Sequence, residues 1–139
     1  MTATFAINGF GRIGRLVFRA WLESGRNDCE ITAINDLAPL ETNAHLLKYD
    51  SVHGRLPYDV DTQGNDILIA NGKKVKVYNQ RNLEDIPKTD EGVDVVLECT
   101  GIFTIIYVNK INRRDASVVS RDMVINDTSC YVGIVYWIT

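Results

Sequence analysis

Residues 8–14 read Asn-Gly-Phe-Gly-Arg-Ile-Gly, which places glycines at positions 9, 11 and 14. The short apolar run Thr4–Ile7 precedes this segment, and a stretch with helical period follows it as far as Gly25, at a position where helices commonly end. Glu30–Ile34 is the next segment with strand-forming residues, and the polar pair Asn35-Asp36 closes it. Residues 4–36 therefore predict a strand, a glycine turn, a helix and a second strand.

The predicted helix after the turn is amphipathic, which indicates that one face packs on the sheet. Its apolar face is expected to carry Phe10, Ile13, Val17, Ala20 and Trp21, and its solvent face Arg12, Arg15, Arg19, Glu23 and Arg26.

Each glycine of the turn has its own expected role in binding a dinucleotide. Gly9 permits the tight turn, Gly11 lets a pyrophosphate approach the backbone without meeting a Cβ, and Gly14 lets helix and strand pack closely. The phosphates would lie against amide groups at the positive end of the helix dipole. The alternative is that all three glycines serve only as turn residues.

Asp36 lies 22 residues beyond Gly14, where dinucleotide-binding proteins of this pattern carry an acid. Its carboxylate would accept hydrogen bonds from the adenosine ribose hydroxyls, and its charge disfavours a 2′-phosphate. NAD is therefore the expected cofactor in preference to NADP, and a helix cap is the alternative role for Asp36.

The middle of the chain predicts an antiparallel insert and one more buried strand. Asn71-Gly72 separates the β-rich segments Ile67–Ala70 and Lys73–Val77, which indicates a hairpin with a two-residue turn. Val93–Leu97 is almost wholly apolar, as are strands inside parallel sheets, and the Thr100-Gly101 turn after it is a candidate second wall of the cofactor cleft. The expected fold is α/β, a Rossmann-type doubly wound and mostly parallel sheet with an antiparallel hairpin insert.

Composition limits the classes of function. The chain has 139 residues, 45% of them hydrophobic, which suits one domain or one domain with an extension. A net charge of −3 makes nucleic acid and acidic membranes poor partners. No apolar run approaches the roughly 18 residues of a membrane span. We therefore expect a soluble, cytoplasmic protein without nucleic-acid or membrane partners.

The cysteines and histidines indicate no metal site. Cys29, Cys99 and Cys130 are odd in number and widely spaced, which argues against a disulfide framework and a zinc site. His45 and His53 have no carboxylate or cysteine at a spacing that implies catalysis or metal binding, so structural roles are expected for both.

Several motifs in order resemble the amino-terminal part of phosphorylating glyceraldehyde-3-phosphate dehydrogenase, over residues 2–104. They are INGFGRIGRLVFRA from residue 7, AINDL at 33–37, ETNAHLLKYDSVHGR at 41–55, NGKKVKV at 71–77 and VDVVLECTGIFT at 93–104. The family reaction is the NAD-dependent oxidative phosphorylation of glyceraldehyde 3-phosphate in glycolysis. The resemblance implies a Rossmann domain followed by a catalytic domain, assembled as a homotetramer.

The resemblance also implies which residues contact NAD, in three groups. Besides the glycines Gly9, Gly11 and Gly14, the pyrophosphate and ribose would meet Asn8, Phe10, Arg12 and Ile13; the adenosine side would meet Asn35, Asp36, Leu37 and Arg81; and the nicotinamide side would meet Thr100, Gly101 and Phe103.

The family's catalytic residues do not recur in this sequence. They are a cysteine within S-C-T-T-N-C at the start of a helix, and a histidine beyond it that withdraws the thiol proton. Here Ser129 and Cys130 match two letters of that motif, the rest is different, and no histidine follows His53. We therefore expect no catalytic residue and no catalytic domain in this chain, and we interpret Cys130, the one weak candidate, as the edge of a strand.

The resemblance ends near Thr104, which suggests a boundary. Residues 1–104 are expected to form the dinucleotide-binding domain, and residues 105–139 a divergent tail whose strands complete the sheet or form an interface. Within the tail, Cys130–Ile138 is a long apolar candidate strand, and shorter candidates lie at 117–120 and 123–125.

Two main hypotheses follow for the function. In the first, the chain is an NAD-binding module without catalysis of its own. In the second, it is part of a working dehydrogenase that further sequence or a second chain completes. A third hypothesis is a structural or interaction protein that has this fold but not its binding function.

Overall fold

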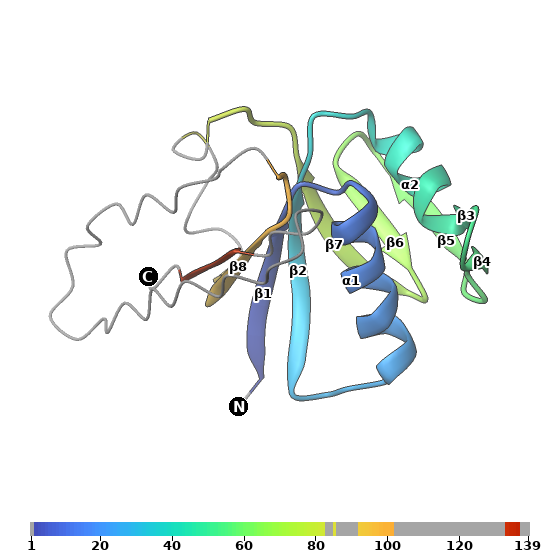
Figure 1. Ribbon diagram of the computed structural model, residues 1–139, viewed down its shortest axis with the longest axis horizontal. Helices are drawn as coiled ribbons and strands as arrows, with labels where there is room; N and C mark the ends of the chain where they lie inside the picture. The colour runs from blue at the N-terminus through green and yellow to red at the C-terminus, as the bar shows by residue number, and fades with distance from the viewer. Residues whose placement is uncertain (1, 83–84, 86–91, 102–132, 137–139) are drawn as a thin grey trace, which may run out of the picture.

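A mixed sheet dominates the part of the chain that the computed structural model describes, which is residues 2–82, 85, 92–101 and, for the backbone, 133–136. Within these residues the sheet has seven strands in the order β5-β6-β7-β2-β1-β8-β9 (Figure 1). The strands are β1 (Ala3–Asn8), β2 (Cys29–Asn35), β5 (Val60–Gln63), β6 (Ile67–Ala70), β7 (Lys73–Tyr78), β8 (Val95–Glu98) and β9 (Gly133–Tyr136). The helices are α1 (Arg12–Ser24) and α2 (Leu40–Lys48), and β3 (Tyr49–Asp50) and β4 (Gly54–Arg55) form a separate small ladder.

The centre of the sheet is parallel, which confirms the predicted Rossmann-type architecture. β1 pairs in parallel with β2 on one side and with β8 on the other, and β2 pairs in parallel with β7. In this register Asn8 lies opposite both Asn35 and Glu98, and Asn35 lies opposite Tyr78. The carboxyl ends of four parallel strands therefore meet along one edge, where sheets of this kind bind ligands.

The predicted hairpin insert is confirmed. β6 and β7 pair antiparallel around Asn71 and Gly72, whose φ angles are 50° and 74°. Two positive φ angles give the turn a twist that matches the strands. β5 pairs antiparallel with β6 and extends the insert.

One segment of the tail joins the sheet at its other side. β9 pairs antiparallel with β8, with Val135 opposite Val96. It covers four residues of the apolar segment 130–138 that the sequence indicates as a strand. The candidate strands at 117–120 and 123–125, and the proposed boundary near Thr104, lie outside the described residues.

The core lies between the sheet and the two helices. Phe18 is fully buried and makes edge-to-face ring contacts with Phe10 and Trp21, with centroids 5.7 Å and 5.3 Å apart. Strand residues such as Ile7 and Ile34, and Leu47 of α2, belong to the same cluster. Gly25, with a φ angle of 61°, caps the carboxyl end of α1, as predicted from the sequence.

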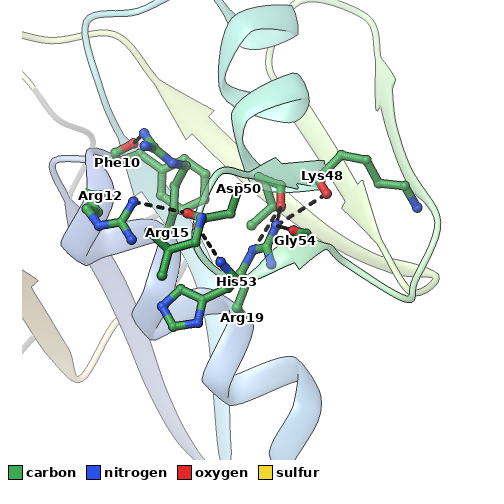
Figure 2. A network of polar contacts seen from close by, with 10 residues as sticks. Phe10, Arg12, Arg15, Arg19, Lys48, Asp50, His53 and Gly54 are labelled. Atoms are coloured by element: carbon green, nitrogen blue, oxygen red, sulfur yellow. Dashed lines mark hydrogen bonds and ion pairs between the residues drawn. The ribbon is translucent and has the colours of Figure 1, made fainter.

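The predicted faces of α1 are wrong at Arg19 and Ala20. Arg19, expected on the solvent face, is buried with 4% of its surface exposed, whereas Ala20 is exposed. The reason is that the Arg19 guanidinium donates hydrogen bonds to three backbone oxygens: those of Leu47 at 2.7 and 3.1 Å, Lys48 at 3.2 Å and Gly54 at 3.0 Å (Figure 2). Arg19 thus joins α1 to the end of α2 and to β4.

Within the described residues, neither helix combines the length and the apolar character that a membrane span requires.

We expect Arg19→Met to lower the free energy of unfolding by about 3 kcal/mol, because it removes both guanidinium donors from the carbonyl of the buried Leu47. The matched control is Arg26→Met, which removes only an ion pair to Asp28 between side chains that are each 61% exposed. Exposed pairs contribute little, so the control should unfold almost like the parent protein. Urea denaturation measures both, and equal effects of the two substitutions would contradict the structural role of Arg19.

Candidate functional site

The glycine turn between β1 and α1 leaves no room for side chains at two of its three glycines. Gly9 has a φ angle of 90°, and a Cβ there would lie 2.7 Å from the backbone nitrogen of Thr100. A Cβ at Gly14 would lie 2.2 Å from the carbonyl oxygen of Gly9. These contacts are below any normal separation, so the turn, the start of α1 and the turn after β8 are packed backbone to backbone.

Gly11 differs from the other two glycines. A Cβ at this position would meet no heavy atom of the described chain within 4 Å. Helix α1 begins at the next residue, and among the described residues no side chain caps it and no acid lies in its first turn. The amide groups at the end of a helix carry a partial positive charge, so this open surface can hold an anionic group.

Asp36 lies at the carboxyl end of β2 and is already engaged by the backbone. One carboxylate oxygen accepts the N–H of Phe10 at 2.8 Å, and the other accepts the N–H of Ala38 at 2.9 Å and, more weakly, the side-chain amide of Asn43 at 3.4 Å. A carboxylate has about four acceptor positions, so capacity for further donors remains. Sequence reasoning missed this structural role, in which Asp36 fixes the glycine turn to β2.

A buried polar row crosses the carboxyl ends of the parallel strands. Asn35 donates to the side-chain oxygen of Asn8 at 2.8 Å, and Asn8 donates to the carboxylate of Glu98 at 2.6 Å. The three side chains are between 3% and 8% exposed. Glu98 was not predicted as a site residue, although an acid that ends an otherwise apolar strand is a visible signal in the sequence.

The turn after β8 is held by hydrogen bonds to the same carboxylate. Glu98 accepts hydrogen bonds from the backbone N–H of Thr100 at 2.8 Å and from the Thr100 hydroxyl. Cys99 donates its backbone N–H to the carbonyl of Asn8 at 2.8 Å, and Gly101 has a φ angle of 68°. Phe103 lies outside the described residues.

Cys99 is poorly suited to be a nucleophile. Burial, with a smaller effect of the neighbouring Glu98 charge, raises the pKa of the Cys99 thiol to about 11. The reactive form of cysteine is the thiolate, which is therefore scarce here at neutral pH. Cys130, the weak catalytic candidate, lies outside the described residues.

Arginines of α1 lie beside the glycine turn (Figure 2). Arg15 donates to the carbonyl of Phe10 at 2.9 Å, and Arg12 lies 3.4 Å from the Asp50 carboxylate. Two backbone N–H groups, from His53 and Val52, hold the pKa of Asp50 below its usual range, and Arg12 adds to this effect. The Arg12 side chain is 45% exposed, so it can also face a ligand over the turn.

The remaining predicted residues lie near this edge without a common contact. Ile13 is half-buried against the core, Leu37 is 49% exposed, and Arg81 is exposed beyond the end of β7. In the part of the chain that the structure describes, no three His, Cys, Asp or Glu side chains are grouped as metal ligands. The site is therefore a backbone-lined, partly cationic edge suited to a phosphate-bearing ligand.

Comparison with known proteins agrees with this geometry. The model of the family described as "Glyceraldehyde 3-phosphate dehydrogenase, NAD binding domain" matches residues 3–106. Among individual relatives, the glyceraldehyde-3-phosphate dehydrogenase of Xanthobacter flavus is 57% identical over 104 residues, and that of Geobacillus stearothermophilus is 52% identical over 104 residues.

The match covers much of this chain and a smaller part of the relatives. In both cases it includes 75% of this chain, but only 31% and 30% of the respective relative. The chain thus spans about a third of the length of the curated relatives it matches. Because the family model and the relatives cover the same glycine turn and parallel strands, the chain belongs to the family of the NAD-binding domain of glyceraldehyde 3-phosphate dehydrogenase.

Proposed function

We propose that this chain binds NAD along the carboxyl edge of β2, β1 and β8. The observation that carries the proposal is the glycine turn, where backbone packing at Gly9 and Gly14 exposes an uncapped helix end and leaves Gly11 open. Membership of an NAD-binding family supports it. Bound NAD would supply a hydride acceptor, and the residues described here would bind and orient it.

The pyrophosphate would lie over Gly11, against the first amide groups of α1. There it would meet the helix dipole, with the Arg12 guanidinium beside it. Asn8, Gly9, Phe10, Ile13 and Gly14 would shape this surface, as the resemblance implies.

The adenosine half would lie toward β2. The remaining acceptor capacity of Asp36 would take a ribose hydroxyl, and its charge would repel a 2′-phosphate, which favours NAD over NADP. Asn35, Leu37 and Arg81 would lie around the adenosine. The nicotinamide half would extend past Thr100 and Gly101 toward Phe103.

We also propose a second, wider role, which the names of the relatives support: the chain supplies the NAD-binding part of a glyceraldehyde-3-phosphate dehydrogenase. In that case it would work in the cytoplasm, as part of a homotetramer, beside a catalytic region from further sequence or another chain. Residues 1–104 would be the binding domain and residues 105–139 an added segment. An NADH absorbance assay with glyceraldehyde 3-phosphate and phosphate tests whether the isolated chain catalyses this reaction. We expect no turnover, and turnover by the isolated chain would refute our expectation of binding without catalysis.

Calorimetric titration tests the proposed binding directly. We expect saturable heat with NAD, ADP-ribose and AMP, since all three carry the adenosine ribose, and weaker binding of NADP. Asp36→Asn should reduce the preference for NAD over NADP about tenfold, because a hydrogen bond to a charged acceptor is replaced and the repulsive charge is removed.

Asp59→Asn is the control for this titration, since Asp59 is an exposed acid away from the turn. It should bind all four ligands like the parent protein. No saturable heat with any adenosine ligand would end the proposal.

The two glycines Gly11 and Gly14 should respond differently to alanine. Gly11→Ala adds a Cβ in open space, so the protein should fold with a loss of only about 1 kcal/mol while NAD binding weakens about tenfold or more. Gly14→Ala forces a backbone clash and should lower the free energy of unfolding by roughly 3 kcal/mol or more. Thermal unfolding and calorimetry separate the two effects, and parental affinity in Gly11→Ala would exclude Gly11 from the phosphate site.

A further inference from the structure

In the buried polar row at the carboxyl edge, each side chain donates a hydrogen bond to the next, from Asn35 through Asn8 to Glu98. Asn35 accepts the backbone N–H of Gln80 at 2.9 Å and donates to the Gln80 carbonyl at 2.9 Å. Asn35 then donates to Asn8, Asn8 donates to one oxygen of Glu98, and Thr100 donates to the other. The row thus joins residues of β2, β1 and β8 to the segments that follow β7 and β8.

We propose that Glu98 is a positioning residue for the nicotinamide half of the cofactor site: its two acceptor oxygens orient the Asn8 amide and hold the Thr100-Gly101 turn. This inference rests on the proposed function of NAD binding. It assigns a role to a residue that has no expected contact with the cofactor.

The direction of the row follows from the peptide groups at its start. The N–H and C=O of Gln80 cannot exchange places, so they fix which end of the Asn35 amide faces them. The Asn35 orientation in turn requires Asn8 to present its oxygen to Asn35 and its NH₂ group to Glu98. Because Thr100 also presents donors, the side chain at position 98 must accept hydrogen bonds at both ends, and only a carboxylate does so.

A glutamine at position 98 would keep the shape but break this pattern. Its NH₂ group would face a donor, either that of Asn8 or those of Thr100. Rotating the Asn8 amide would only move the mismatch to Asn35, and rotating Asn35 would move it to the backbone of Gln80. One donor–donor contact therefore remains wherever the row adjusts, either inside the buried row or at the half-buried Thr100, and such contacts are costly.

The mismatched hydrogen bond would mainly disturb the turn after β8. Thr100 is held by Glu98 through both its backbone N–H and its hydroxyl, and its backbone packs against Gly9 with no room for a Cβ between them. Asp36, by contrast, is held by Phe10, Ala38 and Asn43 and has no hydrogen bond to the row. Loss of the Glu98 acceptor should therefore disturb the nicotinamide side more than the adenosine side.

The test compares Glu98→Gln with the parent chain and with the control Glu23→Gln, an exposed acid on α1. We expect Glu98→Gln to weaken NAD binding about tenfold while AMP binding changes less than about twofold, and to speed exchange of the Thr100 amide proton in the ligand-free protein. Glu23→Gln should change none of the three. Equal weakening of NAD and AMP, or no weakening of either, would overturn the inference.

A second variant separates a broken hydrogen-bond pattern from general destabilisation. Combining Asn8→Asp with Glu98→Gln restores matched partners, because the carboxylate at position 8 accepts from Asn35 and from the new amide, whose oxygen then accepts from Thr100. We expect the double variant to recover the thermal midpoint and the slow Thr100 exchange that Glu98→Gln loses. A double variant less stable than Glu98→Gln alone would refute the proposed direction of the row.

The same experiment distinguishes this inference from the proposed function. If the parent chain binds neither NAD nor AMP, the proposed function fails, and the effect on affinity fails with it. Thr100 exchange needs no ligand, so parental exchange in Glu98→Gln would overturn the positioning role even in a chain that binds NAD.

Discussion

The contact between Gly14 and the carbonyl oxygen of Gly9 determines how the rest of the site is built. Only a residue without a Cβ lets α1 start directly above the end of β1. This start brings Phe10 within reach of Asp36 and leaves the first amide groups of α1 facing outward. The helix end, the ribose-binding candidate and the turn after β8 lie together because two backbone segments touch here.

Local patterns in the sequence predicted most of the fold, since each depends on neighbours along the chain. The glycine spacing gave the strand, turn and helix at residues 4–25, and Asn71-Gly72 gave the hairpin. The burial of Arg19 could not be found in this way, because its partners at Leu47 and Gly54 are brought near only by the packing of α1 on α2.

In the candidate site, too, some features follow from neighbouring residues in the sequence, and others depend on residues far apart in the chain. Asp36 was recognised as an acid at the right spacing, but its hydrogen bond to Phe10 spans 26 positions of the chain. Glu98 was missed because its partner Asn8 lies 90 positions away and becomes a neighbour through the order of strands in the sheet. The contacts of the predicted residues with NAD stay predictions. What the structure adds is that the chain's own contacts hold the glycine turn, through the Phe10–Asp36 hydrogen bond and the backbone packing at Gly9 and Gly14. A turn held in this way reduces the entropy lost on binding.

The antiparallel strand β9 limits where a further strand can join this sheet. β8 is hydrogen-bonded to β1 on one side and to β9 on the other, so both of its edges are occupied. In a doubly wound sheet, a crossover helix would lead to another parallel strand at that position. Here such a strand has no free edge of β8 to join. A segment that extends the described sheet must add at β9 or at β5, in the manner of an inserted or exchanged strand.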